Sequence, residues 1–190
     1  MICKTINDLL ANKFNNYVTK KSFNHAYNFP VEIFDGQMNK PKYLYKSEPF
    51  LRVYEFTSEG PKGSIKKVVQ FTDTGTENVF NLAFGDYDED TKSINDLSVT
   101  NNGDSLKVLA TVASTIYAFT KKYPNAWIVA TGSTNVRTRL YRMGITNHLI
   151  EIKNDFDVYA YTLNGDWEEF IIGEDYEVFL ITRKDNNFTL

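Results

Sequence analysis

The segment from residue 101 to residue 130 restricts the possible folds more than any other part of the chain. The run NNGD at residues 101–104 supplies N-cap side chains, and Pro124 ends the helix predicted for residues 105–123. Apolar residues cover most sides of this helix, so it must be buried against a sheet. Residues 126–130, Ala-Trp-Ile-Val-Ala, lack polar alternation, which is typical of a strand that is covered on both faces and runs parallel to a neighbour. The helix is long enough for the right-handed crossover that such a strand needs.

Before this helix the apolar pattern has a period of two, which predicts strands. Residues 51–56 and 65–71 are rich in β-branched and aromatic side chains. They flank a turn that contains Gly60, Pro61 and Gly63, so we predict a β-hairpin.

A second hairpin is predicted from residues 79–84 and 94–99. Its loop has alternating aspartates over residues 86–90, as a calcium-binding loop does. An EF-hand needs Gly at the sixth loop position and Glu at the twelfth, where this chain has Thr91 and Leu97. The acidic segment is therefore interpreted as a solvated hairpin tip.

After the buried strand, residues 131–135 form a predicted turn into a short helix. That helix is expected to run through about Met143, with Gly144 as its C-terminal cap. Two C-terminal strands are predicted at residues 157–162 and 176–183. The predicted fold class is α+β, with a mostly antiparallel sheet built from a β-meander, a long helix, a buried strand, a short helix and two final strands.

The order of predicted helices and strands divides the chain into a core domain over residues 42–190 and an N-terminal appendage over residues 1–41. An amphipathic helix is predicted over about residues 5–20, with Asn and Lys on its polar side. Its apolar residues are Ile6, Leu9, Leu10, Phe14, Tyr17 and Val18. The arm that follows is rich in aromatic residues, and two alternatives stay open for it. The aromatics pack on the body of the same protein, or they bind a protein partner.

Composition excludes several classes of protein. The 190 residues, 42% of them hydrophobic, are enough to bury a core. Cys3 is the only cysteine, and His25 lies far from His148, so neither a disulfide nor a metal site is predicted. No apolar run is long enough for a membrane span and the start lacks a signal-peptide layout, so we expect a cytoplasmic protein without membrane contact. The net charge of −3 makes nucleic acid an unexpected partner.

One segment has the chemistry of a binding site. Small hydroxyl and amide residues stand where the buried strand meets a helix N-terminus, whose unpaired N–H groups attract anions. Arginines follow at once and add bidentate reach to phosphate or carboxylate. The predicted anion-binding residues are Gly132, Ser133, Thr134, Asn135, Arg137 and Arg139. The alternative is an ordinary helix cap, with the arginines paired to surface carboxylates such as Glu151 or Asp155.

Other candidate residues have weaker support. His148 is placed in a polar turn after the last helix and is interpreted as a surface histidine. Cys3 has no histidine near it in sequence and is not expected to be a nucleophile. Lys62, Lys66 and Lys67, with Arg52 opposite, form a predicted basic face of the first hairpin. The favoured interpretation is a solvated face that protects a sheet edge, and the alternative is a contact with nucleic acid.

Several stretches resemble a family of uncharacterised bacterial proteins. They are YEFTSEGPKGSIKKVVQF, NLAFGD, NNGDSLKVLATVASTIYAFTKKYP and ATGSTNVRTRLYRMGI. The likeness covers roughly residues 43–184 and excludes the N-terminal appendage. It supports the boundaries of the core and implies no activity.

The order of predicted elements also resembles the core of acetyl-CoA-dependent N-acetyltransferases. Asn135 and the pair Leu140-Tyr141 before Gly144 are similar to a late motif of that superfamily. This resemblance implies acetyl-CoA as a cofactor, with Tyr141 as the general acid for the departing thiolate and Asn135 as a cofactor contact.

Three functional hypotheses follow. The first is a non-catalytic ligand-binding or interaction module that binds a small anionic ligand at residues 131–139. The second is an acyl-CoA-dependent N-acyltransferase that uses Tyr141. The third is a regulatory protein that binds a protein partner through its N-terminal arm.

Overall fold

The computed structural model describes residues 40–95 and 100–187. The predicted N-terminal helix and aromatic arm lie outside the described residues. So do residues 96–99, the end of the second predicted hairpin.

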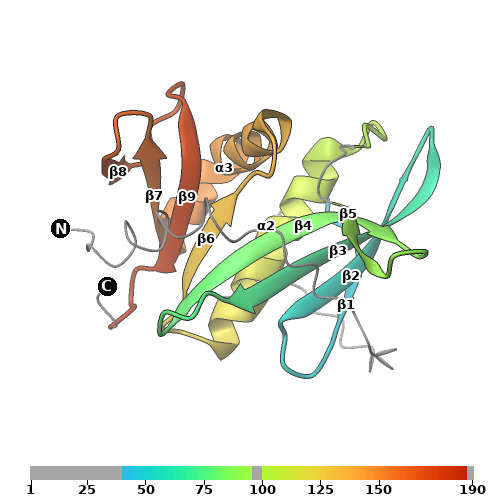
Figure 1. The fold of residues 1–190 in the computed structure, drawn as a ribbon, viewed down its shortest axis with the longest axis horizontal. Coiled ribbons are helices and arrows are strands. Elements are labelled where there is room, and N and C mark those ends of the chain that lie inside the picture. Colours follow the sequence, from blue (N-terminus) through green and yellow to red (C-terminus); the bar gives the residue numbers. More distant parts are fainter. Residues whose placement is uncertain (1–39, 96–99, 188–190) are drawn as a thin grey trace.

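One mixed nine-stranded sheet organises the described residues (Figure 1). The strands are β1 (Tyr45–Ser47), β2 (Val53–Gly60), β3 (Gly63–Asp73), β4 (Val79–Asp88), β5 (Ser93–Asn95), β6 (Trp127–Thr131), β7 (Phe156–Thr162), β8 (Trp167–Glu169) and β9 (Tyr176–Arg183). Their order is β1-β2-β3-β4-β6-β9-β7-β8, with β5 beside β4. Among the described strands only β4 and β6 pair in parallel, which confirms an α+β fold with a mostly antiparallel sheet.

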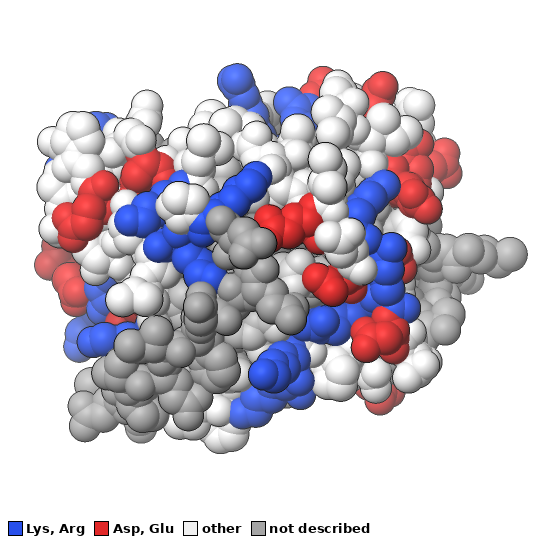
Figure 2. All heavy atoms as spheres, turned by 180° about the vertical axis from the view of Figure 1, so that it is seen from behind, with Lys and Arg blue, Asp and Glu red and all other residues white. Residues whose placement is uncertain are grey.

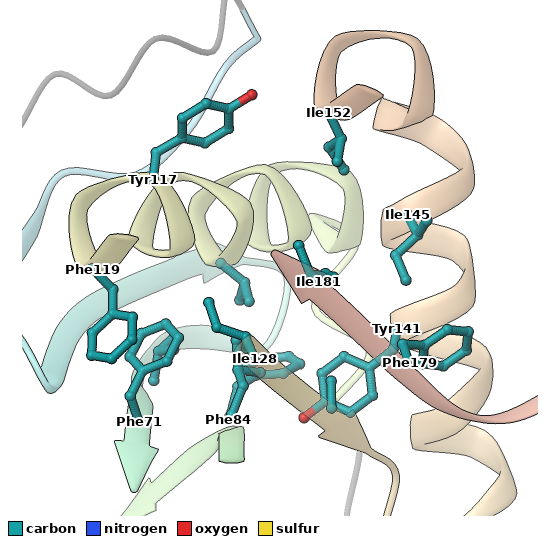
Figure 3. Packing of buried hydrophobic residues seen from close by; sticks show 14 of the residues in the cluster. Phe71, Phe84, Tyr117, Phe119, Ile128, Tyr141, Ile145, Ile152, Phe179 and Ile181 are labelled. Carbon is teal, nitrogen blue, oxygen red and sulfur yellow. The ribbon is translucent and has the colours of Figure 1, made fainter. Parts of the chain in front are cut away.

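Helix α2 (Ser105–Lys122) makes the crossover between the two parallel strands, as its apolar surface predicts. In Figure 1 it lies behind the sheet, and Figure 3 shows Phe119 pointing from it to Phe71 of β3. The two rings stack with centroids 4.1 Å apart. Ile128 and Val129 of β6 have no exposed surface, so the prediction of a strand covered on both faces is confirmed.

Helix α3 (Asn135–Asp155) is much longer than the short helix predicted from the sequence. Gly144 does not end it but lies in its middle, where a Cβ atom would come within 3.2 Å of Leu109 Cδ2 on α2. Beyond Gly144 the helix continues because Ile145 and Ile152 are buried in the core, facing β9 in Figure 3. Tertiary packing therefore overrides the local tendency of glycine to stop a helix.

We expect the substitution Gly144→Leu to force α2 and α3 apart. Overpacking of this kind costs ~1–3 kcal/mol of unfolding free energy, which chemical denaturation measures. Gly144→Ala is the matched control, because the ~1 kcal/mol gain in helix propensity offsets a small shift of Leu109. A Leu variant as stable as the Ala variant would show that the two helices do not meet closely at this position.

Candidate functional site

A small pocket lies where the start of α2, the start of α3 and the strands β3 and β4 meet. Strands β4 and β6 run in parallel and lead through α2 and α3, so the N-termini of both helices face the carboxyl edge of this pair. In open sheets this edge is the usual place for ligands. The pocket has a volume of about 30 Å³, and its charged lining residues are Lys67, Asp86, Asp104 and Arg137.

Lys67 and Asp86 form a partly buried ion pair in this pocket. They are directly opposite each other in the pairing of β3 with β4, and Lys67 is only 4% exposed. The ammonium of Lys67 donates to one carboxylate oxygen of Asp86, and the hydroxyl of Thr100 donates to the other. Pairing of this kind offsets the cost of taking both charges out of water.

Arg137 enters the pocket from the first turn of α3 and is 3% exposed. Its Nη1 donates to the carbonyl oxygen of Phe84, and its Nη2 donates to that of Asn95 at 2.9 Å. The guanidinium also lies over the Phe84 ring, 5.5 Å from its centroid. A Cβ atom on residue 85 would lie 2.5 Å from the carbonyl oxygen of Asn95 and 3.1 Å from Nη2, so Gly85 leaves room for β5 and for this side chain.

Asp104 stands at the N-cap of α2 without making a side-chain capping bond. Its carboxylate instead accepts from the hydroxyls of Tyr43, at 2.7 Å, and Ser58, at 2.6 Å. Burial, together with the neighbouring Asp104 carboxylate, raises the pKa of Tyr43, so Tyr43 stays a hydroxyl donor. The start of α2 borders the pocket through Ser105, while the Asp104 carboxylate is held from the side of β2.

The structure divides the predicted anion-binding residues into two groups. Thr134 is the N-cap of α3, with its hydroxyl accepting from the N–H of Arg137, and Gly132 packs so closely on Thr138 that a Cβ atom would overlap it. The side chains of Ser133, Asn135 and Arg139 are exposed at the surface. The guanidinium of Arg137 lies against β4 and β5, so it is not brought together with the exposed group.

The nearby arginine and tyrosine of α3 have other contacts. Arg142 pairs with Asp175 rather than with either carboxylate suggested from the sequence. Tyr141 is buried, with its ring edge-on to that of Phe84 at 6.1 Å. Tyr141 and Arg137 therefore both pack on Phe84.

The prediction of a surface position for His148 is wrong. His148 lies within α3, is 3% exposed, and neither ring nitrogen has a hydrogen-bond partner in the part of the chain that the structure describes. Burial lowers the pKa of His148, the charge of Lys40 lowers it further, and Glu151 opposes them. The sequence placed this residue outside the helix because the helix was expected to end at Gly144.

Sequence reasoning missed Lys67, Asp86 and Asp104 as site residues. Strand alternation offers a signal for two of them, since residues 67 and 86 occupy the positions that point toward the helices. The neighbouring inward positions hold Val69 and Phe84, both in the core. A charged residue at such a position needs a partner, and the cross-strand register supplies it.

Lysines, arginines and acidic residues are interspersed on the helix-bearing side of the molecule (Figure 2). Among the described residues, no cluster of His, Cys, Asp or Glu could hold a metal ion, and no helix is long and apolar enough to cross a membrane.

The fold defines a small α+β domain with a charged pocket at the edge of its parallel strand pair. Residues 39–184 match a family of unknown function, DUF6934, and the chain belongs to this family. The expected likeness to an uncharacterised family is thus confirmed for the core. No curated protein and no solved structure matches the chain, and the comparisons do not show a likeness to acetyltransferases.

The buried His148 predicts a pH-dependent stability. Because its pKa is lowered in the folded state, the unfolded chain binds the proton more readily. The free energy of unfolding should therefore fall as the pH drops below ~6.5, by at most ~1.4 kcal/mol per pH unit.

Denaturation midpoints between pH 7.5 and 5.5 measure this effect. We expect His148→Leu to flatten the pH dependence, whereas His25→Asn, at the only other histidine, serves as the control. An unchanged slope in His148→Leu would assign the effect to other groups.

Proposed function

We propose that the protein is a non-catalytic ligand-binding module that accepts one small anionic group in the pocket beside Arg137. The observation that supports this proposal is the convergence of Lys67 and Arg137, both at least 96% buried, beside the first turn of α2. Buried cations at a helix N-terminus favour carboxylate or phosphate groups.

Charge and size limit what this pocket accepts. The formal charges of Lys67, Arg137, Asp86 and Asp104 add to zero, so an anion has to share Lys67 with Asp86. A volume of about 30 Å³ corresponds to ~2 water molecules, similar to a single carboxylate or phosphate group. The rest of a larger ligand would extend into solvent from this group.

The described residues do not fit acetyl-CoA. The pocket is too small for a pyrophosphate with its pantetheine arm, and the carboxylate of Asp104 lies at the helix start where phosphates would bind. The backbone carbonyl of Phe84, on the strand beside the pocket, accepts from Arg137. The pocket therefore does not support acyl transfer from acetyl-CoA, and a catalytic role for Tyr141 stays a prediction from the sequence.

Titration with inorganic phosphate at constant ionic strength tests the proposed pocket, with amide NMR shifts and affinity as readouts. We expect Arg137→Gln to abolish the shifts around residues 100–108. Arg139→Gln is the matched control, two residues away on the exposed side of α3, and should bind as the unmodified protein does. Asp104→Asn keeps an oxygen for Tyr43 and Ser58 but removes a negative charge, so it should tighten binding about three- to tenfold, or ~0.7–1.4 kcal/mol.

Two outcomes contradict the pocket. If Arg139→Gln loses phosphate binding while Arg137→Gln retains it, the anion binds at the exposed turn of residues 131–135 and not in the pocket. If phosphate shifts no amide signal in the unmodified protein or in Asp104→Asn, the protein does not bind phosphate and the proposed function is wrong. If Arg137→Gln unfolds by circular dichroism, Asp104→Asn and Arg139→Gln still decide between these cases.

Calorimetry with acetyl-CoA tests the alternative of acyl transfer. We expect no binding heat at millimolar cofactor, because the pocket accepts only one small group. Micromolar binding, together with product formation that Tyr141→Phe abolishes, would establish the acyltransferase and overturn the size argument. Tyr141→Phe removes only the hydroxyl and keeps the ring that packs on Phe84.

A further inference from the structure

The face of the sheet that points away from α2 and α3 has its own apolar cluster. Val79, Val129, Val178 and Leu180 form its centre and are 1%, 0%, 5% and 0% exposed. Around them pack the aromatic side chains of Trp127, Tyr159, Tyr161 and Trp167. These eight residues, from β4, β6, β7, β8 and β9, are called the outer cluster below.

Such burial requires a layer over this face of the sheet, and neither described helix supplies it. Both described helices lie on the other face, behind the sheet in Figure 1. A face in contact with water alternates polar residues outward, whereas Val129 and Leu180 here are fully buried. The outer cluster therefore has the composition and burial of a second core that needs a cover.

We propose that residues 1–39 of the same chain cover the outer cluster, with the apolar side of the helix predicted for residues 5–20 against it. The six apolar residues of this helix at helical spacing provide a complementary surface. Its opposite side, which carries Asp8, Asn12 and Asn15, then faces water. Of the segments outside the described residues, this is the one with enough apolar side chains for the task.

The length of the N-terminal segment and the width of the sheet agree with this arrangement. The described chain begins at Lys40, whose ammonium donates to the carbonyl oxygen of Asn147 on α3 at 2.7 Å, on the helix side of the sheet. Residues 21–39 reach ~60 Å when extended, enough to pass around the edge of the sheet. A 16-residue helix is ~24 Å long and exceeds the ~14 Å across the four strands β4, β6, β9 and β7.

Both tryptophans of the chain belong to the outer cluster, so they report directly on its cover. In the full-length protein, we expect Leu10→Asp to shift the tryptophan emission to longer wavelength and to raise its quenching by acrylamide at least about twofold, because burying a charge opposite apolar residues is unfavourable. Asn15→Asp lies on the side of the predicted helix opposite its apolar residues and is the matched control. Equal behaviour of the two variants would overturn the proposal.

A second measurement identifies the occupant and does not depend on a destabilising variant. A nitroxide label on Phe14→Cys, in a chain with Cys3→Ser, should broaden the indole N–H signals of Trp127 and Trp167 in the full-length protein. Broadening that is unchanged on dilution supports cover by the same chain. Broadening that disappears on dilution would assign the cover to a second copy, and no broadening would leave the arm free for a partner; both results overturn the proposal.

Discussion

The burial of α2 against the sheet is the constraint on which the rest of the structure depends. Its Phe119 stacks on Phe71 of β3 and meets Phe80 of β4 edge-on at 5.0 Å. Each fully buried side chain of this size contributes ~1.5–3 kcal/mol. Because α2 connects β4 to β6, the same contacts set the parallel pairing and place the N-terminus of α2 at the edge where the charged pocket lies.

The pocket shows how charge is tolerated close to such a core. Lys67 is compensated by Asp86, and Arg137 by two backbone carbonyls and the face of Phe84. A buried charge of this kind adds little net stability but is costly to leave without its partners. Arg137 also joins the start of α3 to β4 and β5, so positioning the helix and lining the pocket are tasks of one side chain.

Much of this fold follows from local patterns in the sequence. The strand at residues 176–183 and the β2–β3 hairpin were predicted from strand-forming residues bounded by turn residues, and the buried strand β6 was predicted from an apolar run without polar alternation. The length of α3 was not predicted, because Gly144 is locally a signal for the end of a helix. Only the close contact between Gly144 and Leu109 explains why this glycine lies inside the helix. The pocket was predicted only through Arg137, because its other charged residues are far apart in sequence and meet through strand register.

The two faces of the sheet differ in chemistry, and this separation has a consequence for function. On the helix side, the charged inward residues Lys67 and Asp86 lie at the end of the core beside the start of α2. On the opposite face, Val129 and Leu180 lie in an apolar cluster that contains no charged residue. Because side chains of a strand alternate between the faces, a substitution on one face directly removes contacts on that face alone. The ligand proposed for the pocket and the cover proposed for the outer cluster therefore contact different side chains of one sheet.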